Sequence, residues 1–160
     1  MSFDRVPRPF GRALAATLGL VLLLAPATAF AAAGDVRLPG LSGGQLTSAD
    51  LARGPVVIVV WAGWSPRCRD IVERVNAIQS AWSGRARVVT VNFQEEPAAI
   101  EQFLAGKKLS VPVFLDRDGE FSKSHSVTAL PGLIVFRDGQ VRHAGKLPAD
   151  PGELLNRLLG

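Results

Sequence analysis

Apolar residues follow two distinct patterns in the chain after residue 34. An almost unbroken β-branched run extends from Pro55 to Trp61. A continuous apolar run of this length is typical of a strand buried on both faces of a sheet. After it, apolar residues recur at helical spacing and form one stripe, made by Ile71, Val75, Ile78 and Trp82. We expect this amphipathic helix to start with Ser65 as its N-cap and Pro66 in its first turn, and to end at Gly84.

The alternation of strands and helices continues to the C-terminus. Before the first buried strand, residues 35–54 predict a short strand, a glycine-rich turn and a helical turn opened by Thr47 or Ser48. After the first helix, the pattern predicts strands at 85–93, 111–115, 133–136 and 141–144, a turn at 116–119, and helices that begin at Pro97 and after Pro151. Asp138-Gly139 is typical of a hairpin turn. The sequence therefore predicts an α/β fold with a mixed central sheet flanked by helices on both faces.

The first 33 residues carry a different pattern. No charged residue lies between Ala13 and Ala33, and a short basic stretch precedes this segment. Its apolar core is followed by Pro26 and by small residues that satisfy the small-x-small rule of signal peptidase. We interpret residues 1–33 as a signal peptide for the general secretory route, with an uncleaved membrane anchor as the alternative. Residues 34–160 then form one domain that is exported to the periplasm or another extracytoplasmic space.

Charge and cysteine content exclude several classes of function. The chain has 18 Lys and Arg against 14 Asp and Glu, but part of this excess lies in the first 33 residues. No dense basic run with interleaved aromatics follows, so we expect no nucleic-acid binding. The single cysteine, Cys68, excludes an intramolecular disulfide and a cysteine-rich zinc site. His125 and His143 show no paired-ligand spacing with it, and we expect neither a metal nor a cofactor.

The segment from Trp61 to Arg69 reads WAGWSPRCR. It resembles the W-A-x-W-C-x-x-C-R signature of thioredoxin-fold proteins, specifically the TlpA/ResA-like thiol–disulfide oxidoreductases. Further matching segments follow in the same order, namely Gly54-Pro55, Val91-Asn92-Phe93, Val113 to Asp116, Val127 to Gly132, Asp138-Gly139 and Gly145. The resemblance covers about residues 35–160 and implies a thioredoxin-like fold.

In that family, an exposed thiol at the start of a helix attacks a substrate disulfide, and a second thiol resolves the mixed disulfide. The resemblance places Ser65 at the attacking position and Cys68 at the resolving position. A serine hydroxyl without a neighbouring base is not a nucleophile at neutral pH, so the dithiol cycle is not expected here. The resemblance also implies a cis-proline beside the site. The predicted substrate-binding residues are Trp64, Pro66, Arg67, Leu130 and Pro131.

Two functions follow most directly from this degenerate motif. A monothiol redox protein would use Cys68, activated by the helix dipole and by Arg67 and Arg69, against protein or peptide thiols and disulfides of exported proteins. The opposing interpretation is that Cys68 faces inward as an inert small hydrophobe. A redox-inactive module would instead bind an extended peptide in the groove beside Trp64 and Pro131, as a chaperone-like protein or assembly factor. Ser65 would then act only as a helix cap worth ~1 kcal/mol.

A third function, that of a peroxiredoxin-like peroxidase, fits less well. Its motif would match Ser65 and Cys68 but requires a proline where this chain has Trp61. We expect Trp61 to pack in the core, and Glu95-Glu96 to be solvated charges at the start of a helix. We further expect a monomer that associates with a membrane only if residues 1–33 are retained.

Overall fold

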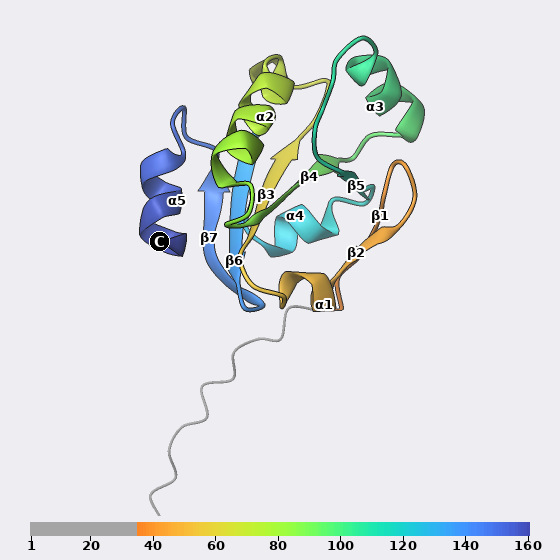
Figure 1. Cartoon of the computed structure of the whole chain (residues 1–160). Helices are drawn as coiled ribbons and strands as arrows, with labels where there is room; N and C mark the ends of the chain where they lie inside the picture. The colour runs from red at the N-terminus through yellow and green to blue at the C-terminus, as the bar shows by residue number, and fades with distance from the viewer. Residues whose placement is uncertain (1–34) are drawn as a thin grey trace, which may run out of the picture. The chain divides into compact units, whose positions relative to one another are not determined.

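The computed structural model describes residues 35–160. A mixed five-stranded sheet forms the centre of this part of the chain (Figure 1). The strands are ordered β5-β4-β3-β6-β7. The parallel half consists of β3 (Val56–Trp61), β4 (Arg87–Phe93) and β5 (Val113–Asp116). On the other side of β3, β6 (Gly132–Arg137) pairs antiparallel with β3, and β7 (Gln140–Lys146) pairs antiparallel with β6. The predicted mixed sheet is confirmed.

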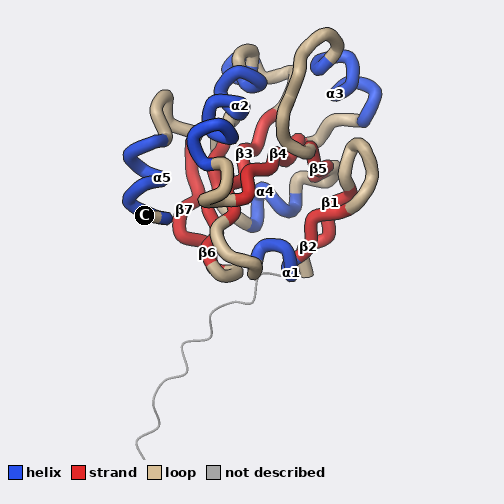
Figure 2. Tube along the Cα trace, viewed as in Figure 1, coloured by secondary structure: helices blue, strands red, loops and turns tan. Residues whose placement is uncertain are grey.

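Helices cover both faces of this sheet, as expected. One face packs against α2 (Ile71–Trp82), α3 (Pro97–Leu104) and α5 (Gly152–Leu159). The opposite face packs against the short helix α4 (Glu120–Ser124) and an N-terminal unit of two strands and one helical turn. That unit comprises β1 (Arg37–Pro39), β2 (Gln45–Thr47) and α1 (Ser48–Leu51). Figure 2 shows these elements as a red sheet with blue helices around it.

The central strand β3 contributes to both cores. All its residues are buried. Val57, Val59 and Trp61 pack into the core beneath α2 and α5. Val56, Ile58 and Val60 pack into the core beneath α4 and the N-terminal unit. This alternation follows from the period of two in a strand, and it confirms the prediction of a strand buried on both faces.

Several element boundaries differ from the predictions. The helix expected to start at Ser65 begins only at Ile71 and is preceded by a 3₁₀ turn, Pro66–Cys68. The helix α4 was not predicted, because five residues without a long apolar stripe give little periodic signal. The predicted hairpin is confirmed, with Asp138 and Gly139 at φ values of 54° and 77°.

The assignments made for residues 1–33 lie outside the described residues, so the signal peptide and the anchor both stay predictions. The described residues form one compact unit. Within residues 35–160, no helix combines the length and the apolar character needed to cross a membrane.

Candidate functional site

The Ser-x-x-Cys segment lies where β3 ends and a tight turn leads into α2. Two backbone hydrogen bonds shape this turn: Ser65 N–H donates to the Ala62 carbonyl at 3.2 Å, and Cys68 N–H donates to the Ser65 carbonyl at 2.9 Å. Because the carbonyl of Ser65 already satisfies the Cys68 N–H, the serine side chain makes no capping hydrogen bond. The prediction that Ser65 stabilises a helix start through its hydroxyl is therefore wrong.

Cys68 faces inward. Its exposed fraction is 0%, and it belongs to the core that also contains Ile71 and Val75. Burial raises the pKa of the Cys68 thiol. Hydrogen bonds from the Ala62 backbone and the Ser65 hydroxyl lower this pKa, as does the positive charge of Arg74, but the effect of burial is larger. At neutral pH the sulfur is therefore held as a protonated thiol inside the protein. This geometry agrees with the inert interpretation of Cys68.

Ser65 is also enclosed, with 7% of its surface exposed. Its hydroxyl interacts with the Cys68 thiol, which lies on the inner side of the turn. Within residues 35–160, no histidine or carboxylate forms a hydrogen bond with this hydroxyl. Without such a base, the serine has no means of becoming a nucleophile.

A groove of about 430 Å³ opens beside the turn; we call it the Trp64 groove. It is lined by residues 64–67 of the turn, by Phe93 at the end of β4 and by residues 127–130. Trp64 is 61% exposed, which is unusual for so large an apolar side chain. The structure thus brings together four of the five predicted substrate-binding residues, namely Trp64, Pro66, Arg67 and Leu130.

The fifth predicted residue, Pro131, lies outside the lining of the Trp64 groove. The Leu130–Pro131 peptide bond is cis, as the resemblance implied. Pro131 is buried, and its carbonyl accepts a hydrogen bond of 2.9 Å from Leu147 N–H in the loop after β7. It lines a neighbouring hollow, and Arg67 lines both the hollow and the groove. A direct contact of Pro131 with a ligand in the Trp64 groove is therefore not supported.

Glu95 is a site residue that the sequence reasoning missed. Its carboxylate accepts hydrogen bonds of 2.6 Å from Gly63 N–H and 2.6 Å from the side-chain amide of Asn92. A side chain at Gly63 would meet Glu95 and Phe103, so the loop before Trp64 passes close to both. Glu95 is thus not a purely solvated charge. The only sequence signal was a carboxylate three residues after a buried asparagine at the end of a strand.

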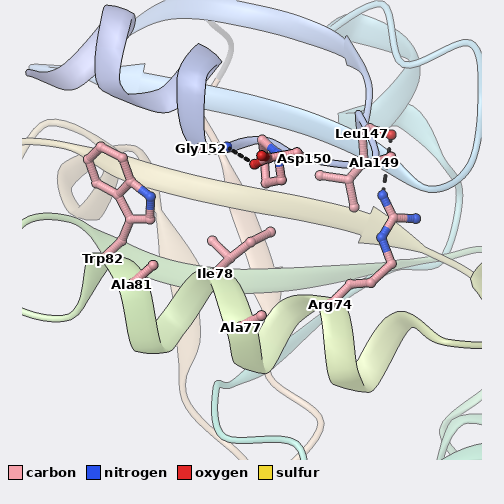
Figure 3. Close-up of a pocket in the computed structure, with 10 residues that line it drawn as sticks. Arg74, Ala77, Ile78, Ala81, Trp82, Leu147, Ala149, Asp150 and Gly152 are labelled. Carbon is pink, nitrogen blue, oxygen red and sulfur yellow. Dashed lines mark hydrogen bonds between the residues drawn. The ribbon is translucent and has the colours of Figure 1, made fainter.

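A separate pocket of about 290 Å³ lies between α2 and the segment that leads into α5 (Figure 3). Trp82 and Arg74 lie toward opposite ends of it, and Ile78 lies between them. Its lining contains no thiol and no hydroxyl group, and its one carboxylate, that of Asp150, accepts a hydrogen bond from Gly152 N–H at 2.8 Å. The pocket is mainly apolar and offers no nucleophile.

Within residues 35–160, no hydrogen bond joins His125 or His143 to Cys68. The ring of His125 packs at a tilt against Phe121 and edge-on against Phe136, and its Nδ1 lies 2.7 Å from the Phe121 carbonyl oxygen. In the part of the chain that the structure describes, no three His, Cys, Asp or Glu side chains form a group suited to a metal ion.

Comparisons with known proteins agree with this architecture. The Redoxin family model matches residues 25–157. Sporulation thiol-disulfide oxidoreductase A of Bacillus subtilis is 27% identical over 86 residues, covering 51% of this chain and 52% of that protein. Thiol:disulfide interchange protein DsbE of Yersinia pestis is 33% identical over 100 residues, covering 58% of this chain and 50% of that protein. The matched part thus spans about half the length of these two relatives.

Solved structures show the same fold. A secreted Mycobacterium tuberculosis disulfide oxidoreductase superimposes with a TM-score of 0.63 at 22% identity, covering 78% of this chain and 94% of that one. The family model, the order of the strands and the cis Leu130–Pro131 bond all agree with the resemblance first seen in the Trp61–Arg69 segment. The chain therefore belongs to the Redoxin family, as a thioredoxin-fold member of the TlpA/ResA-like type.

Proposed function

We propose that this chain is an exported, redox-inactive member of its family that binds extended segments of other exported proteins in the Trp64 groove. The observation that carries the proposal is the position of its only sulfur. Cys68 has no exposed surface, and burial raises the pKa of its thiol. A substrate disulfide cannot reach a thiol in this position, and the thiol is not ionised to the thiolate that would attack it.

The resemblance supports the loss of the attacking group. Ser65 stands where the family has its exposed cysteine, and an oxygen cannot take part in reversible disulfide exchange. Val59, six residues before Ser65, is buried and apolar, where cytoplasmic thioredoxins carry a proton-shuttling acid. What remains is a groove with an exposed aromatic side chain at its edge. An exposed aromatic residue beside a concave surface is typical of a binding anchor.

Export is supported by the pattern of residues 1–33 and by the fold shared with a secreted Mycobacterium tuberculosis disulfide oxidoreductase. The ligand class follows from the family, whose members act on protein thiols and disulfides and so receive polypeptide segments. The protein would bind such segments as a monomer.

A second candidate, the monothiol redox protein, keeps one favourable observation. The Ser65 hydroxyl and the charge of Arg74 both lower the pKa of Cys68, although burial raises it by more. The peroxidase candidate has no such support, because buried Trp61 stands where its proline is needed.

Thiol accessibility separates the two leading candidates. In the folded chain, Cys68 should react with iodoacetamide only as fast as the protein unfolds, whereas urea should expose it to rapid labelling. Rapid labelling of the native protein would refute the redox-inactive proposal and favour the monothiol candidate. The Ser65→Cys variant provides the positive control for redox chemistry, since it restores the second thiol of the family motif and should bring measurable reduction of insulin.

Peptide binding tests the rest of the proposal. The probe is a fluorescent Gly/Ser peptide of about ten residues with one phenylalanine, which spans roughly 30 Å when extended. Trp64→Ala should weaken binding at least about fivefold, because loss of an aromatic anchor typically costs more than about 1 kcal/mol. Cys68→Ala should bind like the unchanged chain. Equal binding by Trp64→Ala, with circular dichroism showing a folded variant, would refute the assignment of the groove.

A further inference from the structure

A second hollow adjoins the Trp64 groove and differs from it in charge. It measures about 460 Å³ and lies between the 3₁₀ turn, α2 and the end of β7. Arg67, Arg74 and Lys146 contribute cationic groups to its lining, whereas Asp70 contributes the only carboxylate. We call it the cationic hollow. Arg67 lines both this hollow and the Trp64 groove, so the two adjoin at this residue.

The positive charges of the cationic hollow are not neutralised within the described chain. The ion pairs among residues 35–160 involve Arg37, Arg53, Arg87, Arg117 and Lys123, and none involves a cation of the hollow. Asp70 likewise has no cationic group within 4.0 Å in that part of the chain. The hollow therefore keeps a net positive charge that an anionic group from outside can meet.

Arg74 is held in place by neutral groups. Its guanidinium donates to the carbonyl of Pro148 at 2.8 Å and to the carbonyl of Leu147 at 3.4 Å. The bond to Leu147 is drawn in Figure 3. These bonds fix the side chain between α2 and the loop after β7 while leaving its charge unpaired. Arg67 and Lys146 are exposed and make no side-chain hydrogen bond with another described residue. The hollow thus combines one positioned cation with two adaptable ones.

We propose that the cationic hollow selects peptides that carry an aspartate or glutamate near the apolar residue bound in the Trp64 groove. This inference rests on the proposed function and specifies its ligand class. Guanidinium groups match the two oxygens of a carboxylate, and complementary charge favours correct partners over wrong ones. In an extended peptide, the apolar side chain occupies the Trp64 groove while an acidic side chain a few residues away reaches Arg67 and Lys146.

The test compares peptides that differ only in one charge. Each is a fluorescent Gly/Ser peptide with one phenylalanine and with glutamate, glutamine or lysine one to three residues to either side of it. Fluorescence anisotropy should show that the best glutamate peptide binds about two- to fivefold more tightly than its glutamine counterpart, with lysine the weakest. The difference should shrink in about 0.5 M salt, where the screening length falls to a few ångströms.

Charge reversal assigns this preference to the hollow. Arg67→Glu and Lys146→Glu should each remove the preference for glutamate, and both are exposed positions at which the fold does not depend on a partner. Arg142→Glu is the matched control, because it makes the same charge change at an exposed position of β7 outside the hollow, and it should keep most of the preference. Circular dichroism verifies that all three variants are folded.

The outcomes separate this inference from the function on which it rests. If glutamate and glutamine peptides bind equally, or if Arg142→Glu removes the preference as fully as Arg67→Glu does, the inference is overturned and peptide binding stands. If none of the peptides binds the unchanged chain, the proposed function fails and the inference fails with it.

Discussion

Replacing Glu95 by alanine tests whether one carboxylate holds the loop in front of the Trp64 groove. This carboxylate accepts hydrogen bonds from Gly63 N–H and from the amide of Asn92, both at 2.6 Å. A hydrogen bond to a charged group contributes about 1.5–3 kcal/mol, and an amide left without a partner in the interior costs about 1–3 kcal/mol. Asn92 is only 1% exposed, and its Oδ1 already lacks a partner among the described residues.

Because Glu95 itself is half-buried, water replaces part of what is lost at Gly63. We therefore expect Glu95→Ala to lower the free energy of unfolding by about 2 kcal/mol. With a urea dependence of about 1–3 kcal/mol per molar, the midpoint of unfolding should fall by roughly 1 M. Glu95→Gln, which keeps an oxygen acceptor but not the charge, should lose about half as much.

The measurement is urea unfolding followed by tryptophan fluorescence. Glu96→Ala is the matched control, because Glu96 is the adjacent carboxylate, is exposed and makes one ion pair of 3.7 Å with Arg117. Such a surface pair contributes about 0–1 kcal/mol, so its midpoint should hardly move. If both alanine variants shift the midpoint by the same small amount, Glu95 does not anchor the loop and our reasoning is wrong.

Two further predictions concern the fold around the site. The capping hydrogen bonds from Thr47 lower the pKa of Asp50 in the folded chain. Its carboxylate therefore stabilises the fold at pH values above the ordinary aspartate pKa of about 3.9, and this stabilisation is lost as the pH falls through the lowered pKa of the folded state. The urea midpoints of the unchanged chain and Asp50→Asn should therefore differ at pH 7 and converge at strongly acidic pH; a constant difference would contradict this. Gly119→Ala should cost more stability than Gly84→Ala, because both glycines have positive φ but only at Gly119 would a new Cβ approach another residue, Phe93, to 2.7 Å. Thermal unfolding should show a loss of about 1–2 kcal/mol for Gly84→Ala and a clearly larger one for Gly119→Ala, and equal losses would refute the steric argument.

The strands were predictable where burial dominates the residue pattern. A strand made from the apolar run ending at Trp61 would have apolar side chains on both faces, so neither face can be exposed to water without cost. The run accordingly forms the central strand β3. The hairpin at Asp138-Gly139 was predictable because few residues adopt positive φ at two successive positions. In both cases a local property of the sequence agrees with the tertiary environment.

The start of α2 was less predictable. Ser65 and Pro66 have the composition of a helix N-terminus, yet Cys68 N–H bonds to the Ser65 carbonyl and closes a 3₁₀ turn instead. Choosing between the two depends on hydrogen-bond geometry that periodicity does not encode. The same limit applies to Glu95, whose role depends on the approach of Gly63 from 32 residues earlier in the chain.

The motif predicted most of the binding residues, but it did not predict that they divide between the Trp64 groove and the cationic hollow. Arg67 and Leu130 were both predicted as binding residues, and both line the groove. The placement of Pro131 in a different, cationic hollow depends on its carbonyl bond to Leu147, which no local pattern predicts.

The sharing of β3 between two cores has a consequence for cooperativity. Alternate residues of one backbone are embedded in the layer beneath α2 and in the layer beneath α4. If one layer unfolds, β3 loses half of its packing and the other layer loses its support. The two layers should therefore unfold together. The segment that follows Trp61 is thereby joined to a strand that is buried along its whole length, so the rim of the Trp64 groove has a firm base even though Trp64 itself is exposed to solvent.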